Sequence, residues 1–414
     1  MANIDRESHP MPESHGSVAA LLRAAAPDEL VEVADGFVRT RLGGSRTDVL
    51  VADYRIAGLW PVLGERHPAG GPLAEATAAV RCFSSQRSVV EPAAAGGVRL
   101  YLPVTAWGER IGVLVTDFAA APDRQLLDEV GQVADELAVA LRAADRDTDR
   151  YRRARRRERL TMAAEMQWDL LPGRSQAHPA YQLAGQLEPA YTVGGDHFDW
   201  ALTGDRLTVT VLNGDGAGLA ASLLTAVTVN AMRNARRSGG SLVEQAELAS
   251  DTVFAEHRGT RHVATLLLEV DLPTGRVRLV DAGSPRALLM RGQQVELLQL
   301  DQQLPLGMFA DTRYEAQEIQ LEPDDRLVVV SDGVYTATPD GRPAYGESAL
   351  ARGIRRTRLQ PATEAVGTVM RELHAYHEHA DLEDDAVIVC LDWQGMKVDT
   401  AGTGVGGIEP DRTG

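Results

Sequence analysis

The N-terminal part of the chain shows a helical pattern of apolar residues followed by strand-like runs. Apolar residues recur at helical spacing over residues 17–37, and residues 48–54 form a first strand-like run. Two further runs, residues 98–103 and 110–117, are separated by a turn. This order predicts an α/β domain over residues 17–122.

A second helical pattern begins near Asp123 and meets no proline before Pro172, so we predict one linker helix over residues 123–171. Its apolar residues form a narrow seam at spacings of four, three, four and four: Leu126, Val130, Val133, Leu137 and Leu141. Such a seam is typical of paired helices and predicts a homodimer formed through this helix. The alternative is that the seam packs on the sheet of its own domain.

The C-terminal part alternates strands with helices. Residues 206–212 alternate apolar and polar side chains with a period of two, whereas residues 326–331 and 386–391 are almost continuously apolar. Further strands are expected at residues 263–271, 276–281, 287–291 and 295–299, and helices at 221–237, 347–357 and 361–379. Many strands with helices inserted between them predict an α+β layered sandwich.

Composition and charge restrict the class of protein. The chain has 414 residues, 44% hydrophobic residues and a formal net charge of −17, which is typical of a soluble protein of two or three domains. No apolar run is long enough to span a membrane, and residues 1–16 lack the apolar core of a signal peptide. Two cysteines, Cys82 and Cys390, are too few for a disulfide framework, which fits a reduced cytoplasm. Cys82 is expected in the core, with a sensing thiol as the alternative, and Cys390 is expected in the core because it lies inside an apolar run.

Nucleic-acid binding is disfavoured by the same charge. An arginine-rich run at residues 152–159 is the feature that would support it. Acidic residues flank this run, the arginines spread around the predicted helix, and few aromatic residues are interleaved. We therefore interpret the run as a solvated helix face.

Acidic residues next to glycines stand at four strand boundaries of the C-terminal part. Asp196 lies in VGGDHFD, Asn213 and Asp215 flank Gly214 after the strand at 206–212, and Asp332 follows the strand at 326–331. The fourth boundary is Asp384 with its neighbour, directly before the strand at 386–391. Carboxylates that converge without His or Cys favour Mg²⁺ or Mn²⁺ over zinc.

The motifs around these residues, in their order and spacing, resemble the SpoIIE-like class of PPM-type (protein phosphatase 2C-like) metal-dependent Ser/Thr phosphatases. The resemblance begins near residue 160 with AAEMQWDLLP and continues with EPAYTVGGDHFDW and GAGLAASLLTA. It also includes DAGSPRALLMR, LPLGMF, DRLVVVSDGVYTA and LEDDAVIVCLDW. The N-terminal pattern, above all the hairpin LYLPVTAWGERIGVLVTDF, resembles a GAF sensor domain in architecture.

The resemblance implies an α-β-β-α sandwich that holds two Mn²⁺ or Mg²⁺ ions and hydrolyses phosphoserine or phosphothreonine. Asp196, Asp332 and Asp384 would be the catalytic metal ligands, and Gly214 would offer its carbonyl oxygen. The implied substrate is a phosphorylated regulatory protein of the anti-sigma-factor antagonist type, and the sensor domain would control the reaction. The expected organisation is a disordered arm (1–16), a GAF-like domain (17–122), a linker helix (123–171), a phosphatase domain (172–394) and a disordered tail (395–414).

One position departs from the pattern of the class. Asn213 stands where the family has an aspartate that bridges both metals, and a neutral amide offers one ligating oxygen in place of two. Asp215, two residues further on, is the candidate to replace the missing carboxylate. The alternative function is therefore a catalytically weak or inactive phosphatase-like protein that binds its partner without turnover.

Overall fold

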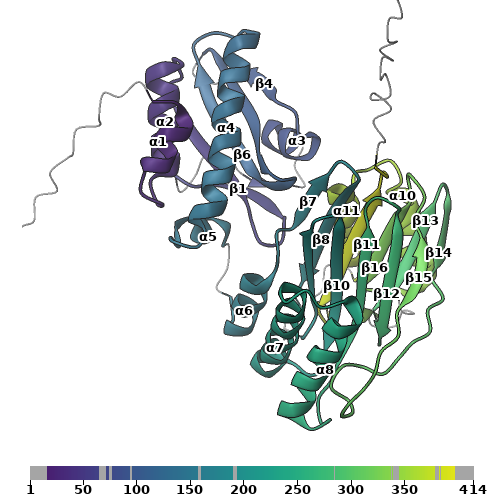
Figure 1. Cartoon of the computed structure of the whole chain (residues 1–414). Helices are drawn as coiled ribbons and strands as arrows, with labels where there is room; N and C mark the ends of the chain where they lie inside the picture. The colour runs from purple at the N-terminus through teal and green to yellow at the C-terminus, as the bar shows by residue number, and fades with distance from the viewer. Residues whose placement is uncertain are drawn as a thin grey trace, which may run out of the picture. The chain divides into compact units, whose positions relative to one another are not determined.

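The computed structural model describes residues 16–64, 71–73, 77–93, 96–156, 160–189, 194–283, 285–336, 338, 345–377, 382 and 384–396. The arm and the tail expected at the two ends lie almost wholly outside these residues. The chain divides into two compact units, Met1–Arg159 and Leu160–Gly414 (Figure 1). This division falls inside the segment for which the sequence predicted one linker helix.

Unit 1 is a six-stranded antiparallel sheet with helices on both faces. The strand order is β3-β2-β1-β6-β5-β4. Its elements are α1 (Val18–Ala24), α2 (Leu30–Arg41), β1 (Thr47–Ala52), β2 (Gly58–Pro61), β3 (Gly71–Pro72), α3 (Ala78–Ser85), β4 (Val89–Pro92), β5 (Val98–Ala106), β6 (Glu109–Phe118), α4 (Arg124–Ala144) and α5 (Arg150–Arg155). The predicted strands at 98–103 and 110–117 are confirmed by β5 and β6.

Each face of this sheet has its own hydrophobic core. On one face, Val49 and Leu100 pack with residues of α1, α2 and α4. On the other face, Leu50 and Tyr101 pack with Cys82 of α3 and its neighbours. Burial raises the pKa of the Cys82 thiol to about 12, so the expectation that Cys82 is a core residue is confirmed.

The predicted single linker helix is wrong, because the structure has three helices in its place. The first, α4, ends at Ala144; the second is α5; and the third, α6 (Met162–Leu170), belongs to unit 2. The break after α4 contains residues whose side chains compete for backbone hydrogen bonds, and the Thr148 hydroxyl accepts from the backbone N–H of Arg150 at 3.2 Å. A new helix start follows at Thr161, whose hydroxyl accepts from the backbone N–H of Ala164 at 3.2 Å.

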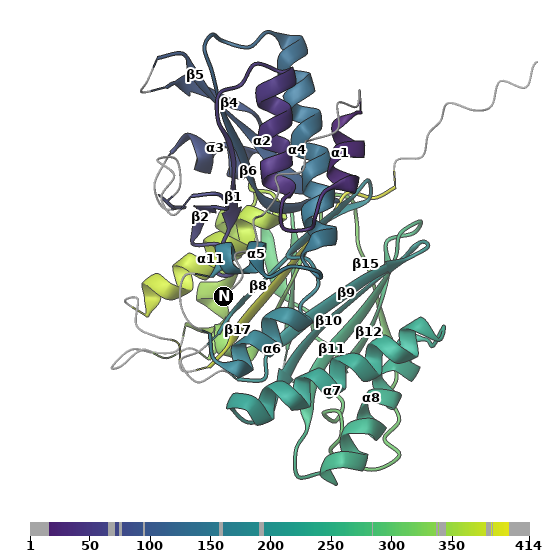
Figure 2. The same cartoon turned by 90° about the vertical axis from the view of Figure 1, so that its left-hand side faces the viewer.

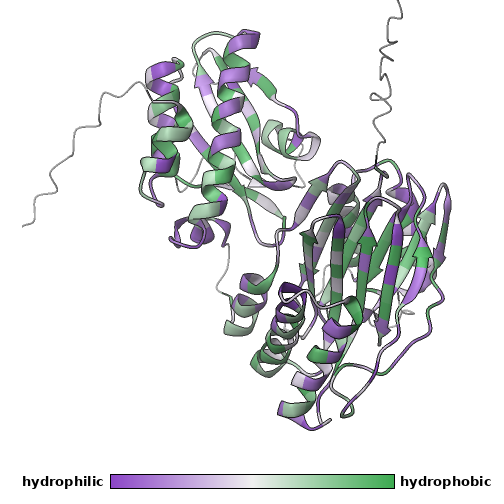
Figure 3. Cartoon of the chain, viewed as in Figure 1, coloured by the Kyte–Doolittle hydropathy of each residue, from purple (hydrophilic) through white to green (hydrophobic). Residues whose placement is uncertain are grey.

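The apolar seam of α4 is buried inside unit 1. Val130, Val133 and Leu137 are fully buried, and Leu141 retains 4% exposure. They belong to the same core as the sheet residues Leu100 and Leu102 and helices α1 and α2. The argument for a homodimer through this seam is therefore wrong, and the alternative, packing on the sheet of its own domain, is the observed one. In Figure 3, α4 carries hydrophobic and hydrophilic residues by turns along its length.

Unit 2 consists of two antiparallel sheets and their covering helices. One sheet has the order β15-β12-β11-β10-β9 and the other β14-β13-β16-β17-β8-β7. The elements after α6 are β7 (Ser175–His178), β8 (Tyr181–Glu188), β9 (His197–Thr203), β10 (Arg206–Gly214), α7 (Gly218–Arg237), α8 (Leu242–His257), β11 (Val263–Asp271), β12 (Arg276–Ala282), β13 (Arg286–Arg291), β14 (Gln294–Leu297), β15 (Gln317–Gln320), β16 (Arg326–Val330), α9 (Asp332–Tyr335), α10 (Gly346–Arg356), α11 (Ala362–Tyr376) and β17 (Ala386–Trp393).

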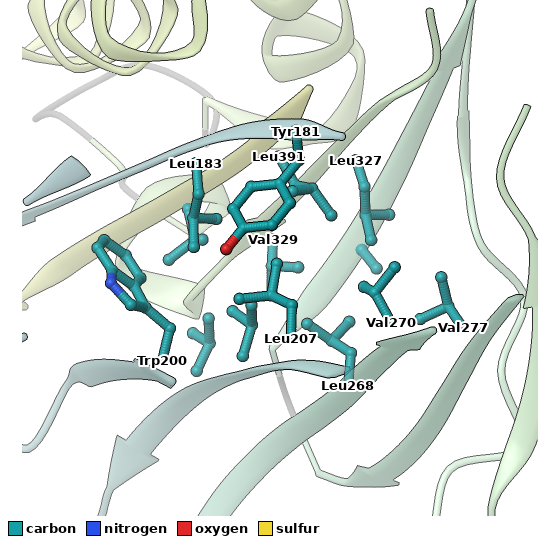
Figure 4. Close-up of a cluster of buried hydrophobic side chains, with 14 of the residues drawn as sticks. Tyr181, Leu183, Trp200, Leu207, Leu268, Val270, Val277, Leu327, Val329 and Leu391 are labelled. Atoms are coloured by element: carbon teal, nitrogen blue, oxygen red, sulfur yellow. The ribbon is translucent and has the colours of Figure 1, made fainter. Parts of the chain in front are cut away.

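The two sheets pack face to face between two layers of helices, which confirms the predicted layered sandwich. The central core joins Tyr181 and Leu391 of one sheet to Leu207 and Leu268 of the other (Figure 4). Helices α7 and α8 cover the sheet of β9–β12 and share a core with its outer face (Figure 2). Helices α10 and α11 cover the other sheet, and Cys390 is buried beneath them, as expected.

Candidate metal centre

The strand boundaries that the sequence singled out lie at one end of the sandwich. Asp196 directly precedes β9, and Asn213 and Gly214 end β10, where the backbone N–H of Gly214 donates to the carbonyl oxygen of Gly195 at 3.1 Å. Asp332 follows β16 in the opposite sheet, and Asp384 lies just before β17. Two strands of each sheet therefore bring these residues together.

A hydrogen bond joins the two sheets at this end. The side-chain Nδ2 of Asn213 donates to Oδ1 of Asp332. Both residues are partly buried. Asn213 thus supplies a donor at the position where the resemblance implies a carboxylate.

Asp196 is the most deeply buried acid of the site. Its side chain is fully buried, and neither carboxylate oxygen accepts a hydrogen bond from the residues that the structure describes. Burial raises the pKa of Asp196 well above its usual value, and the negative charges of Asp385, Asp384 and Asp332 raise it further. The Ser331 hydroxyl, which does not meet hydrogen-bond geometry with the carboxylate, offsets this shift in the pKa only in part. A buried, unpartnered carboxylate among other acids is stabilised when a cation binds beside it.

Asp384 and Asp385 take different positions. Asp384 is exposed, and its Oδ1 accepts from the backbone N–H of Asp385 at 2.8 Å. Loss of hydration at the carboxyl group raises the pKa of Asp384, and Asp332 and Asp385 add to the shift. Asp385 is fully buried. The sequence proposed Asp384 as a ligand, and the structure adds Asp385 as a second acid of the site.

Gln167 of α6 connects this helix to the acidic residues. Its Nε2 donates to Oδ2 of Asp385 at 2.9 Å and to the carbonyl oxygens of Gly194 at 3.1 Å and Asp196 at 3.2 Å. Gln167 is 2% exposed. The sequence motif AAEMQWDLLP contains this residue, but only the tertiary contacts identify its partners.

Asp199 lies close in sequence and has a structural role. Its carboxylate forms ion pairs with Arg233 at 2.7 Å and Arg236 at 3.1 Å, both on α7. Arg233 also donates to the carbonyl oxygen of Leu170, at the end of α6, at 2.8 Å. Asp199 is therefore already neutralised by two arginines and is a poor candidate for a metal ligand.

Asp215 lies on the outer turn after β10. The residue is exposed, its backbone N–H donates to the carbonyl oxygen of His262 at 3.2 Å, and its carbonyl oxygen accepts from Arg261 at 3.1 Å. These contacts fix the backbone of the turn with the side chain on the exposed surface. Among the described residues, the hydrogen bonds of Asp215 involve its backbone, and its role as the replacement for the bridging carboxylate stays a prediction.

The acids are neighbours without being arranged around one point. Within the described part of the chain, no three Asp, Glu, His or Cys side chains form a group that could hold a metal ion as they stand. The oxygen donors nevertheless fit a hard cation, since Asp196 has two buried oxygens without a partner. Ion binding at this site would therefore require side chains, Asp332 among them, to reorient.

Comparison with known sequences agrees with this reading of unit 2. A family model described as Stage II sporulation protein E (SpoIIE) matches residues 203–394. The chain is 22% identical over 260 residues to protein IcfG of Synechocystis sp., an alignment that covers 56% of this chain and 41% of that protein. It is 26% identical over 137 residues to the phosphoserine phosphatase RsbP of Bacillus subtilis, which covers 32% of this chain and 34% of that protein. The chain thus spans less than half the length of these curated relatives.

Solved structures of low sequence identity are similar to part of this chain. The SiaA-PP2C domain of Pseudomonas aeruginosa is 19% identical, with a TM-score of 0.46 over 51% of this chain and 86% of that chain. The PP2C phosphatase domain of SpoIIE from Bacillus subtilis, with a fragment of its regulatory domain, is 19% identical, with a TM-score of 0.47 over 53% of this chain and 65% of that chain.

None of the helices in the described ranges is long and apolar enough to cross a bilayer.

Proposed function

We propose that this chain, whose residues 203–394 match the Stage II sporulation protein E (SpoIIE) family model, is a SpoIIE-type PP2C phosphatase that hydrolyses phosphoserine or phosphothreonine on a regulatory protein. The observation that carries the proposal is Asp196, a fully buried carboxylate without a hydrogen-bond partner in the described structure and with three acidic neighbours. Such a group is neutralised by a proton or by a bound cation, and metal-dependent phosphate chemistry uses a cation.

Asp196, Asp332 and Asp384 would hold Mn²⁺ or Mg²⁺, two ions in all, with Gly214 offering its backbone carbonyl oxygen. Bound metal would supply Lewis-acid polarisation of the phosphoryl oxygens and activation of water. Asn213 would position Asp332 through its side-chain hydrogen bond. Gln167 would hold Asp385 and the backbone around Asp196 in place.

The substrate that we propose is a phosphorylated protein of the anti-sigma-factor antagonist type. Its support is the similarity to a relative that is a phosphoserine phosphatase, RsbP. Unit 1, with its sheet covered on both faces, would act as a GAF-like sensor domain that controls the reaction.

The test is hydrolysis of a phosphoserine peptide and of a generic phosphate ester over a range of Mn²⁺ and Mg²⁺ concentrations. We expect turnover by the wild-type chain that depends on metal and is lost in Asp332→Asn. Turnover that persists in a chelator, or that survives Asp332→Asn unchanged, would contradict the proposal.

A second candidate function is favoured by the hydrogen bond between Asn213 and Asp332. A site in which a neutral amide binds one of the acids would bind metal weakly and capture a partner without turnover. In that case wild type is inactive at millimolar Mn²⁺, whereas Asn213→Asp hydrolyses the same peptide.

A further inference from the structure

An acidic site needs a cationic group for its substrate as well as for its own carboxylates. A phosphate ester carries negative charge, and Asp196, Asp332, Asp384 and Asp385 all lie at the end of the sandwich that it must reach. Arginine is suited to this task because its planar guanidinium donates two parallel hydrogen bonds to a phosphate. The arginine suited to this role lies beside the acids and is not already enclosed by a structural network.

Arg286 lies next to the site through the sheet register. It is the first residue of β13, and its backbone pairs with Val330, the last residue of β16. Asp332 follows two residues after Val330. Arg286 thus occupies the strand beside the one that carries Asp332, at the same end of the sheet.

Among the described residues, the side chain of Arg286 has an aromatic support and an acidic partner. Its guanidinium carbon lies 4.1 Å from the centre of the Tyr335 ring, and Tyr335 ends the short helix that begins at Asp332. The guanidinium also pairs with the carboxylate of Glu347 on α10. The Arg286 side chain is 37% exposed and that of Glu347 48% exposed, so solvent reaches this ion pair.

Tyr335 shows that Arg286 shares the electrostatic surroundings of the acids. Burial is the main cause that raises the pKa of Tyr335. Arg286 lowers it, whereas Asp332 and Asp196 raise it. One phenol ring therefore responds to the arginine and to two of the site's carboxylates.

Other arginines on this sheet are enclosed differently. Arg326 is 4% exposed and donates to Thr357, Gln360 and the carboxylate of Asp392. Arg291 forms a two-point contact with the buried Asp325. These networks hold the two guanidinium groups in place. Arg286 instead has a half-exposed acid that a phosphate could displace, and a flat ring that orients the guanidinium plane.

We propose that Arg286 binds the phosphate of the substrate. Its guanidinium would give up the ion pair with Glu347, bind the phosphorylated side chain instead and stay stacked on the Tyr335 ring. This inference rests on the proposed function, since it assigns a specificity-determining residue to the same site. Glu347 would then compete with the substrate for the guanidinium. The two residues are therefore expected to affect phosphate binding in opposite directions.

The experiment is calorimetric titration of the full chain with inorganic phosphate in millimolar Mg²⁺. Arg286→Gln is expected to weaken binding about 10- to 100-fold, the effect of losing a charge-assisted contact. Glu347→Gln is expected to tighten it about threefold, an effect of the size measured for exposed ion pairs. Arg276→Gln is the matched control, because Arg276 forms a half-exposed ion pair with Glu318 at the other end of the opposite sheet.

A purely structural role for the Arg286–Glu347 pair predicts that both variants lower the melting temperature and change phosphate binding in the same direction. That result, or equal phosphate affinity in wild type and Arg286→Gln, would overturn the inference. Absence of phosphate binding to wild type would also overturn it. Peptide hydrolysis is measured separately, so loss of turnover with Arg286-dependent phosphate binding would refute the proposed function and leave this inference standing.

Discussion

The side-chain amide of Asn213 donates a hydrogen bond to Asp332 across the gap between the two sheets. An amide at this point neutralises no charge but satisfies one oxygen of the Asp332 carboxylate. At the proposed metal site, Asn213 also takes the place of one carboxylate ligand. It would therefore lower metal affinity while stabilising the metal-free site.

The substitution Asn213→Asp tests this exchange. It replaces a donor by a second carboxylate next to Asp332, so the metal-free protein should melt at a lower temperature at neutral pH. Mn²⁺ affinity should rise about 10- to 100-fold, because one more negative charge lies close to the ion. Calorimetric titration and melting curves with and without chelator measure both. A variant that binds Mn²⁺ no better than wild type would show that position 213 does not contact the ion.

Asp215 is expected to contribute little to metal binding. Asp215 is exposed, and its backbone contacts stabilise the turn. Asp215→Asn should therefore change Mn²⁺ affinity by less than about twofold, as is usual for a screened surface charge. A sharp loss of affinity or activity would instead identify Asp215 as the replacement for the bridging carboxylate.

Asp196→Asn should stabilise the metal-free protein at neutral pH. The folded state raises the pKa of Asp196, so stability falls as pH rises from the usual value of 3.8 through the raised pKa. Removal of this buried charge should increase the free energy of unfolding by about 1–3 kcal/mol. Urea denaturation in chelator measures the gain. In excess Mn²⁺ wild type should become the more stable of the two proteins, because only wild type keeps the metal ligand. If the variant remained the more stable protein, Asp196 would not be a ligand.

His197 should cause loss of stability in mild acid. Burial lowers the pKa of this side chain from 6.5 to about 4, with Arg233 lowering it and Asp199 raising it. The unfolded state binds the proton more readily, so stability falls as pH decreases from about 6.5 to about 4, by about 3 kcal/mol in total. His197→Phe removes this titrating group, so its stability should depend less on pH than that of wild type over this range. Asp196 is present in both proteins, so its contribution cancels in the comparison. Parallel slopes in urea midpoints across that range would disprove the assignment.

Gln167→Leu should weaken the site from the side of α6. The change removes three hydrogen bonds, including the one to the buried carboxylate of Asp385. We expect a loss of about 2–3 kcal/mol in the free energy of unfolding and weaker Mn²⁺ binding. Gln299→Leu, at an exposed position of the same unit, is the control and should leave both unchanged. If Gln167→Leu and wild type bound Mn²⁺ with equal affinity, Gln167 of α6 would not contribute to metal binding.

The sequence predicted some elements of unit 2 and missed others, among them strands β7, β8, β9 and β15. Residues 263–271 were predicted with the observed bounds of β11, because an apolar run between turn residues has few alternatives. Helix α8 was not predicted, although Ser241 and Glu244 form a capping box at its start. The break between α4 and α5 contains no proline or glycine, so apolar spacing alone could not find it. The seam of α4 looked unpartnered because its partners lie far away in the chain.

The same limit applies to the site. The predicted strand ends grouped Asp196, Asn213, Asp332 and Asp384, because apolar periodicity and flanking turn residues indicate where a strand stops. Gln167 could not be assigned because its three acceptors come from two distant segments. Such relationships are fixed by tertiary packing and leave no local pattern.

The glycines beside the acids make the backbone of the site less replaceable than its ligands. A side chain at Gly195 would overlap the carbonyl oxygen of Gly214, and one at Gly333 would overlap that of Asp385. Asn213 and Asp332 are partly buried side chains with room for an isosteric exchange. A mutant library selected only for folded protein should thus recover amides for carboxylates at the site and reject alanine at both glycines. If selection for catalysis were lost, the acids would be substituted first, while the glycines would be retained because the fold requires them.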